Sequence, residues 1–495
     1  MPNEKQIIRT LTEPTIILDD LQFLDTETGT GKVLGKPETA YKPSKQYGGA
    51  FPLIKLNNYI FPSDTVKELR ISSADIRPYV SIVAELRDKS FYSTAFPKDG
   101  DVVSIFIRGK VDPFKPIRND YEITSVYVDN VPGGGETTPD TLHISGVLKI
   151  PDFDAVKCFS VKGTSFKTMM KVATDLKLGF ASNEVDTSDS QTWLCPNEKV
   201  KNFLDETVLA SWKDENSFFS YFIDHYYIMN FVNVEYMYSE QPDFEQAISL
   251  LRMSSDYLKD SEISGSLGKL VLSNWEEISQ SQLFITQHSL INNSASINLS
   301  HGYKRYSQFY DGLLKENQSF FVDPKTTPGK ENDHQLLKGR PNENQYLKQI
   351  NTKWMGVQYG KDGENCHPKY NYAKVTNYQN NTHLEKMGLK IKLANPNFNL
   401  RRMQTVPVVI VIGSDYGRKK INEPIDESNK SSSGNSNEPN KTQPAVDVEK
   451  LPFTVDKTMS GFYVLHTIDY IFENGNFYQE CTLFRREWPT PPQSH

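Results

Sequence analysis

Several short motifs in the sequence resemble sites of chemistry, but each departs from the pattern that its chemistry needs. Gly29–Thr30–Gly31–Lys32 suggests a phosphate-binding loop, which requires G-x-x-x-x-G-K-[S/T] between a strand and a helix. The first glycine is missing, Val33 stands where Ser or Thr is needed, and no helical pattern follows. We therefore expect neither a nucleotide site nor any other cofactor.

Hydrolytic motifs are absent as well. The chain contains no G-x-S-x-G and no H-E-x-x-H, the patterns typical of serine hydrolases and zinc peptidases. Asp224–His225 adjoins the end of an expected helix, but neighbouring helical residues point about 100° apart and form no dyad by themselves. A glycosidase needs only two facing carboxylates, so the 62 acidic residues leave a peptidoglycan-degrading enzyme as an alternative.

The cysteines predict neither a metal site nor a disulfide framework. All four lie far apart and form no C-x-x-C pair, a pattern that suits synthesis in a reducing compartment. Cys366–His367 is the single adjacent Cys/His pair, and we interpret it as part of a loop. The four are Cys158, Cys195, Cys366 and Cys481.

Basic clusters are short. Arg401–Arg402 and Arg418–Lys419–Lys420 are interpreted as solvated surface. Arg485, Arg486 and Trp488, near the end of the chain, are the candidate interface residues, because Trp and Arg are enriched in interface hot spots. Trp488 as a residue that caps a barrel is the alternative. We predict no catalytic, cofactor-binding or metal-binding residue.

Composition limits the class of protein. A chain of 495 residues predicts about three domains. With 55 basic and 62 acidic residues the net charge is −7, which does not favour a protein that grips nucleic acid over a broad surface. Residues 1–10 hold no apolar segment and no run of about 18 apolar residues exists, so we expect neither a signal peptide nor membrane insertion.

Two blocks of the sequence read as β-structure. Short runs rich in Val, Ile, Phe and Tyr, separated by turn residues, are typical of a small barrel or sandwich. In the last block, Asn474–Gly475 lies between two alternating apolar runs, which predicts a hairpin. The runs are 54–60, 66–72, 80–86, 102–107, 121–128 and 142–148, then 388–393, 406–412, 462–472 and 477–484.

The middle of the chain reads as mixed α and β. Apolar spacing predicts helices over 164–178, with Gly179 as the C-cap, over 202–209 and over 217–224. Residues 226–234 are expected to form a strand. Residues 416–450 are too polar to bury a core, and we expect an exposed, mobile insertion.

The two β blocks echo each other. Each has an apolar strand, a connector, a Tyr-x-[Ile/Leu]-x-[Ser/Thr]-[Val/Ile] run at Tyr121 or Tyr463, and a hairpin. One interpretation is that any two hairpins look alike at this level. The other is that the chain holds two copies of one small barrel.

The chain resembles the baseplate hub proteins of contractile-tailed bacteriophages of the T-even type. No single motif carries the likeness, which rests on the order of four stretches that cover about half of the chain. They are 72–86 with 96–101, 163–166 with 178–183, 212–219 with 222–232, and 461–463 with 483–489. The N-terminal arm, residues 315–370 and the 416–450 insertion depart from the family.

This resemblance implies a mainly β fold with an α+β insertion, made of two small tudor-like β-barrels and a mixed middle region. The domain ranges that we expect stand together here: an N-terminal arm over 1–50, a first barrel over 51–137, a discontinuous second barrel over 138–160 and 386–489, a helical or mixed domain over 161–236, and a β-rich or irregular domain over 237–385.

The resemblance also implies a structural, non-enzymatic role. Three chains would close a ring that adapts the sixfold tail tube to the threefold central spike, beside other baseplate proteins, and genomic DNA would pass through its lumen without specific binding. We expect a location in the tail baseplate of the virion after synthesis in the cytoplasm of the host bacterium. A host-binding tail protein is a further alternative.

Overall fold

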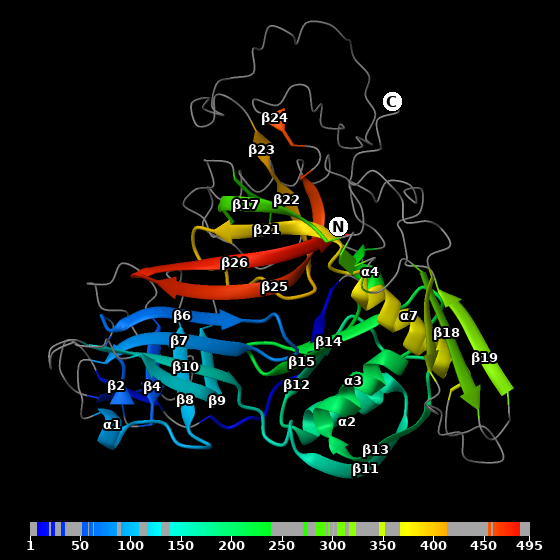
Figure 1. Cartoon of the computed structure of the whole chain (residues 1–495), viewed down its shortest axis with the longest axis horizontal. Coiled ribbons are helices and arrows are strands. Elements are labelled where there is room, and N and C mark those ends of the chain that lie inside the picture. The colour runs from blue at the N-terminus through cyan, green and yellow to red at the C-terminus, as the bar shows by residue number, and fades with distance from the viewer. Residues whose placement is uncertain are drawn as a thin grey trace, which may run out of the picture.

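A computed structural model gives the fold (Figure 1). No helix in its described part is long and apolar enough to cross a membrane. The described residues are 7–18, 21–24, 31–34, 52–57, 59–62, 64–86, 91–107, 116–129, 139–238, 271–274, 283–293, 296–297, 300, 304–311, 316–322, 346–351, 367–412, 454–456 and 459–485.

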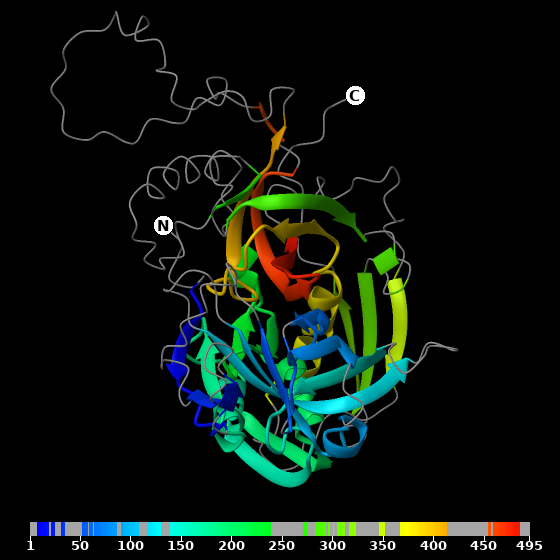
Figure 2. The same cartoon turned by 90° about the vertical axis from the view of Figure 1, so that its left-hand side faces the viewer.

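One large sheet of 13 strands dominates the molecule, so the predicted mainly β fold is confirmed. In Figure 1 its strands are stacked from β17 near the top to β9 near the bottom, and Figure 2 shows how strongly they curl. The strands, in sheet order, are β17 (Ile285–Asn292), β21 (Met387–Leu393), β26 (Asn476–Arg485), β25 (Gly461–Glu473), β6 (Val66–Ser72), β7 (Tyr79–Leu86), β10 (Asp140–Leu148), β9 (Ile117–Asp129), β8 (Val102–Ile107), β4 (Leu53–Leu56) and β5 (Tyr59–Ile60), with β16 (Leu272–Ser273) and β22 (Thr405–Val409) off this path.

Alternation of apolar and polar residues produces these strands. In β7, every second side chain from Val80 to Leu86 is buried, while those between are half-buried, as expected where one face of a sheet meets a core. The predicted hairpin is confirmed, since β25 and β26 pair up to Glu473 opposite Asn476. Asn474 and Gly475 both have positive φ, at 50° and 81°, as a type I′ turn requires.

The sheet consists of two similar halves. We call β4, β6, β7, β8, β9 and β10 the first unit, and β16, β17, β21, β22, β25 and β26 the second unit. Hydrogen-bonded neighbours run β4-β8-β9-β10-β7-β6 in the first unit and β16-β22-β25-β26-β21-β17 in the second. A bridge between Ser273 and Phe284 joins β16 to the start of β17 and closes the second unit. Two copies of one topology therefore stand side by side.

The two units also share their irregularities. The β9–β10 ladder skips Thr124, and the β25–β26 ladder skips His466 at the corresponding place. The β6–β7 ladder skips Lys67, and the β17–β21 ladder skips Thr286. Two β-bulges at matching positions are far more specific than a likeness between hairpins, so the echo in the sequence is a true internal repeat. The units differ at β4, which is antiparallel to β8, whereas β16 is parallel to β22.

Two strands join a unit other than the domain in which their residues are expected, which is the second barrel for 138–160 and the irregular domain for 237–385. β10 lies within 138–160, and it pairs with β7 and β9 of the first unit. β17 lies within 237–385, and it pairs with β21 of the second unit. The insertion 416–450 lies outside the described residues.

A mixed α and β region packs beside the large sheet, on the right in Figure 1. The predicted helices at 164–178 and 202–209 are confirmed as α2 and α3. Its elements are α2 (Ser165–Asp175), α3 (Val200–Ala210) and α4 (Glu235–Tyr238), the sheet of β1 (Arg9–Thr12), β12 (Gly179–Ser182), β15 (Ile228–Asn233) and β14 (Phe219–Ile223), and the pair β11 (Val156–Gly163) and β13 (Gln191–Lys199).

The helix predicted over 217–224 is wrong, because Phe219–Ile223 form strand β14. Its side chains alternate: Phe219, Tyr221 and Ile223 enter the main core, while Phe222 enters a second cluster of buried residues. A strand that is covered on both faces is a continuous apolar run, and such a short run does not distinguish strand from helix.

Gly179 is not the C-cap that the sequence predicts. Lys177 takes the left-handed conformation after α2, with φ of 61°, and Gly179 begins β12. A Cβ on Gly179 would lie 2.7 Å from the carbonyl oxygen of Thr12. The glycine is therefore needed for the close approach of the N-terminal segment.

A helix in the range expected to be irregular joins the middle region to the second unit. It is α7 (Tyr370–Thr382), which packs against α3 and a three-stranded sheet. The remaining elements are α1 (Phe91–Thr94), β18 (Lys304–Asp311), β19 (Glu316–Val322), β20 (Tyr346–Asn351), and the pairs β2 (Leu21–Leu24) with β3 (Gly31–Leu34) and β23 (Val411–Ile412) with β24 (Thr454–Val455).

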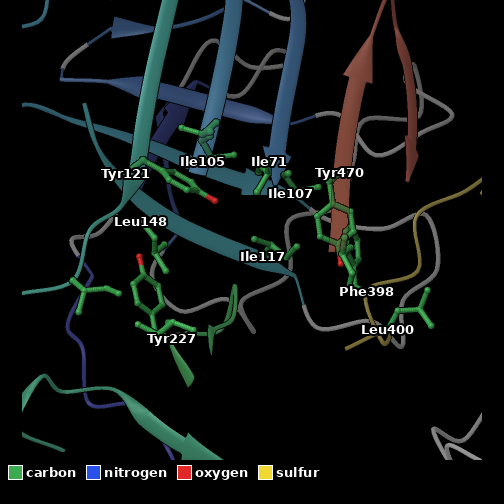
Figure 3. Packing of buried hydrophobic residues seen from close by; sticks show 14 of the residues in the cluster. Ile71, Ile105, Ile107, Ile117, Tyr121, Leu148, Tyr227, Phe398, Leu400 and Tyr470 are labelled. Carbon is green, nitrogen blue, oxygen red and sulfur yellow. The ribbon is translucent and has the colours of Figure 1, made fainter. Parts of the chain in front are cut away.

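The main hydrophobic core connects the parts. Figure 3 shows Tyr121 of the first unit, Tyr227 of the middle region and Tyr470 of the second unit within one cluster. The turn between β14 and β15 enters this cluster, where Asn119 donates a hydrogen bond to the carbonyl of His225 at 2.8 Å. The backbone N–H of Asp120 donates to the Tyr227 hydroxyl at 3.0 Å.

Candidate assembly interface

The strand register gives the eight strands from β17 to β9 one common outer face. Residues on it are mostly half-buried or exposed, while the opposite face is core. We call it the polar face. Its charged residues within the described part are eight carboxylates, Glu68, Glu85, Asp120, Glu122, Asp129, Asp469, Glu473 and Glu480, and five basic side chains, Lys67, Arg70, Arg118, Lys390 and Lys392.

Cross-strand pairs organise these charges. Lys67 lies 2.9 Å from Glu85, and Lys390 lies 2.9 Å from Glu480. These pairs are partly exposed, so each contributes little to stability, typically up to about 1 kcal/mol. They leave the polar face with three more negative than positive groups, which gives it an acidic character.

A hydrogen-bonded seam joins the two units in the middle of this face. β25 pairs with β6 from Asp469 opposite Ser72 to Glu473 opposite Glu68. Asp469, 5% exposed, accepts hydrogen bonds from Arg70 and from the Ser72 hydroxyl, each at 2.5 Å. Charge-assisted bonds of this kind are stronger than neutral ones, so the seam is a specific joint and not a loose contact.

Both outer edges of the eight-stranded segment include an open stretch within the described residues. β8 covers β9 from Ile117 to Glu122, and the Ile123 amide still donates to the carbonyl of Asp101 at 3.3 Å. Among the described residues, the segment 124–129 has no strand neighbour on that side. β17 pairs with β21 on one side. On its other side, the bridge between Phe284 and Ser273 lies before the first residue of β17, so no described strand pairs with β17 itself there. Unpaired edges of this length are templates for another strand.

Apolar side chains accompany these edges. Leu290 of β17 is 44% exposed and Tyr127 of β9 is 54% exposed. The Tyr127 ring stacks on His143 with centroids 4.3 Å apart, and His143 Nε2 lies 3.1 Å from an Asp129 carboxylate oxygen. Tyr127 is thus held in a fixed orientation beside the open edge. Alternation in the strands could have placed it on this face, but nothing in the sequence marks β9 as an edge.

Of the predicted interface residues, the structure describes only Arg485. Its side chain is buried, with the guanidinium 4.6 Å from the centre of the Tyr463 ring and Nη1 donating to the carbonyl of Ser460 at 3.2 Å. Burial lowers the pKa of Arg485 to about 10. This group faces the interior of the second unit. Arg486 and Trp488 lie outside the described residues.

Where the structure describes them, the residues of the motifs that suggest chemistry occupy structural positions. Gly31 and Lys32 belong to strand β3. His225 is buried in a turn, and its pKa is lowered to about 4 by burial. His367 is buried, with Nε2 2.9 Å from the carbonyl of Ala210, and Cys366 lies outside the described residues.

A buried serine and aspartate also have a structural role. Ser165 at the start of α2 donates its hydroxyl to Asp189 at 2.5 Å, and the Trp212 amide donates to the same carboxylate at 2.8 Å. Both side chains are fully buried and cannot meet a substrate. Within the described part of the chain, no three His, Cys, Asp or Glu side chains gather in a way that could hold a metal ion.

Comparison with known proteins gives matches at the level of structure alone. No family model and no curated protein matches the sequence. The 43 kDa tail protein of prophage MuSo2 from Shewanella oneidensis has a TM-score of 0.46 at 9% identity, over 88% of this chain and 98% of that one. A tail protein from Neisseria meningitidis MC58 has a TM-score of 0.44 at 10% identity, over 89% and 98%.

A further similar structure is an Escherichia coli component of the type VI secretion system, described as structurally similar to the T4 bacteriophage tail proteins gp27 and gp5. Its TM-score is 0.38 at 6% identity, over 89% of this chain and 79% of that one. The similar solved structures thus include bacteriophage tail proteins and a component of a secretion system.

Proposed function

We propose that this chain is a structural hub of a bacteriophage tail, in which three copies form a ring around a channel for DNA. The observation that carries the proposal is the pair of matching β-units joined into one sheet with a polar face and two open edges. Three chains would supply six units, and a ring of six can match a sixfold tube on one side while its chains match a threefold spike on the other.

The charge of the polar face supports a role as the channel wall. An acidic surface repels a phosphate backbone, so DNA passes without specific binding. The cross-strand pairs keep this surface hydrated, whereas the other side of the same strands is core. Tail tube, central spike and other baseplate proteins are the partners in this proposal, and the virion baseplate is its location.

Strand directions are also compatible with a closed ring. Every neighbouring pair from β17 to β9 is antiparallel. Because eight strands is an even number, β9 of one copy and β17 of the next run in opposite directions. A head-to-tail arrangement of copies then continues the antiparallel order, and such heterologous contacts generate closed rings when the rotation closes.

Light scattering after size-exclusion chromatography tests the proposal. We expect a particle of about 170 kDa, three times the chain mass of 56.5 kDa, and negative-stain images of a threefold ring with a central hole. A stable monomer at tens of micromolar that also stays monomeric with its spike partner would contradict the proposal. Lysis of peptidoglycan by the isolated chain would favour the alternative of a peptidoglycan-degrading enzyme. Binding of the isolated chain to intact host cells would favour the alternative of a host-binding tail protein.

A further inference from the structure

The internal repeat allows the contact between copies to be worked out residue by residue. The matched bulges align β25 with β9, so that His466 corresponds to Thr124, Asp469 to Tyr127 and Tyr470 to Val128. They also align β6 with β17, so that Lys67 corresponds to Thr286 and Ile71 to Leu290. The seam inside the chain therefore joins the equivalents of its two open edges.

Burial differs sharply between equivalent positions. Ile71 is 0% exposed and Tyr470 is 2% exposed in the seam between β6 and β25, whereas Leu290 is 44% exposed and Val128 is half-buried. Asp469 is 5% exposed and its equivalent Tyr127 is 54% exposed. Positions that the seam covers inside the chain are uncovered at the two ends of the sheet.

We propose that β9 of one copy pairs with β17 of the next and repeats the internal seam, with Val128 opposite Leu290. This inference rests on the proposed function and specifies the contact that closes the ring. The register follows from the internal seam, where Tyr470 lies opposite Ile71 and Asp469 opposite Ser72. By equivalence, Tyr127 lies opposite Ile291, and Asp129 lies opposite Ser289.

The side chains on the two edges suit this register. Val128 and Leu290 both lie on the core side of the sheet, because their partners Leu142 and Leu389 are fully buried. Pairing would join exposed Leu290 to half-buried Val128 above a continuous core. On the polar face, the Asp129 carboxylate meets the Ser289 hydroxyl, as Asp469 meets the Ser72 hydroxyl within the chain.

A slip by one residue would be unfavourable. It would place Val128, on the core side, opposite Ser289 or Ile291, which lie on the polar face, whereas directly opposite residues of paired strands lie on the same face. The bulges at Thr124 and Thr286 fix which residues of each edge face the core. The register is therefore set by features that each chain already contains.

Disulfide trapping tests this contact in the full-length chain. Chains with Val128→Cys are mixed with chains with Leu290→Cys, both in a Cys158→Ser, Cys366→Ser background, and then oxidised. Residues opposite each other in an antiparallel pair have Cα atoms about 4.5–5.5 Å apart, within the range for a disulfide. Where β9 of a Val128→Cys chain lies beside β17 of a Leu290→Cys chain, we expect most of these chain pairs to migrate as disulfide-linked dimers on a non-reducing gel.

The matched control is Tyr127→Cys mixed with Leu290→Cys. These two positions are adjacent in the proposed pairing but face opposite sides of the sheet, so we expect at least tenfold less cross-linking. A trimeric ring in which Val128→Cys and Leu290→Cys cross-link no better than this control would overturn the seam and leave the proposed function standing. A monomer in which no pair cross-links would remove both.

A pair of point variants tests the same contact without oxidation. Leu290→Lys puts a charge on the core side of the edge. We expect the midpoint of trimer dissociation to lie at a protein concentration at least tenfold higher for this variant than for the wild-type chain. Gln287→Lys adds the same charge to the same strand on its polar face, and we expect a change of less than threefold. Equal effects of the two variants would overturn the proposal.

Discussion

Replacing Asn377 by alanine should loosen the contact between α7 and the middle region. The fully buried side chain of Asn377 donates to the carbonyls of Leu209 and Ser211, each at 2.8 Å, and to that of Val208 at 3.3 Å. Its Oδ1 accepts a hydrogen bond from the amide of Phe219 at 3.0 Å. One residue thus bonds two carbonyls in the last turn of α3, the carbonyl of the C-cap residue Ser211, and the first amide of β14.

The size of the effect follows from the groups left behind. Helix ends leave carbonyls without intrahelical partners, and a buried polar group without a partner costs about 1–3 kcal/mol. Two short carbonyl contacts and one amide would be lost together. Because they belong to one network and do not add simply, we expect about 3–5 kcal/mol of destabilisation.

Hydrogen exchange under native conditions is the suitable assay, because a chain of several domains need not unfold in one step. The amide of Phe219 and those of the neighbouring strand residues should exchange about 100-fold faster or more in Asn377→Ala. The control is Asn381→Ala, whose half-buried side chain bonds only the carbonyls of Phe219 and Asn377, with an expected cost of about 1 kcal/mol. An Asn377→Ala chain that exchanges like this control would refute the reasoning.

Three further predictions concern the joints of the fold. Burial lowers the pKa of His225 to about 4, so the contribution of the neutral imidazole to stability is present above pH 6.5 and is lost as the pH falls toward 4, by up to about 3 kcal/mol. His225→Phe should therefore reduce the loss of stability that melting curves show between pH 7.5 and 5. The same pH dependence in the variant and the wild-type chain would contradict this prediction. Asp469→Asn should destabilise the seam by about 1–3 kcal/mol, because Arg70 and Ser72 lose a charged acceptor; urea denaturation with no shift would argue against this. Gly388→Ala should prevent β21 from pairing normally, since its Cβ would lie 2.0 Å from the carbonyl oxygen of Leu483; a soluble variant with wild-type melting would disprove the clash.

Local pattern was enough to predict most of the β-structure. The runs 66–72 and 102–107 are strands with those bounds, since alternation and turn residues act within a few positions of the chain. The Asn474–Gly475 turn belongs to the same class of signal. Even the internal repeat was visible, because both units kept the Tyr-containing strand that begins near Tyr121 and Tyr463.

Long-range pairing was not predictable in the same way. Nothing in residues 140–148 says that they also pair with β7, because their partners in that strand lie more than 50 residues away along the chain. The helix α7 was missed because its sequence, rich in Asn and Tyr, has little apolar periodicity. Its stability comes from buried hydrogen bonds such as those of Asn377, which depend on α3 being in place.

The candidate interface shows the same limit. Arg485 belongs to a residue type favoured at contacts between chains, but the strand places its guanidinium over Tyr463 inside the second unit. Exposed Leu290 and Tyr127 carry no signal of their own in the sequence. They stand out only when compared with Ile71 and Asp469, their buried equivalents in the other unit.

Strand β25 has a mechanical consequence for the chain. Its first residues pair with β22 of the second unit and its last five pair with β6 of the first unit, so this one strand is hydrogen-bonded to both units. A force that separates the two units across the sheet would act on all the β25–β6 hydrogen bonds at the same time. We therefore expect these bonds to break together, as one large rupture event in force spectroscopy and not as two small ones.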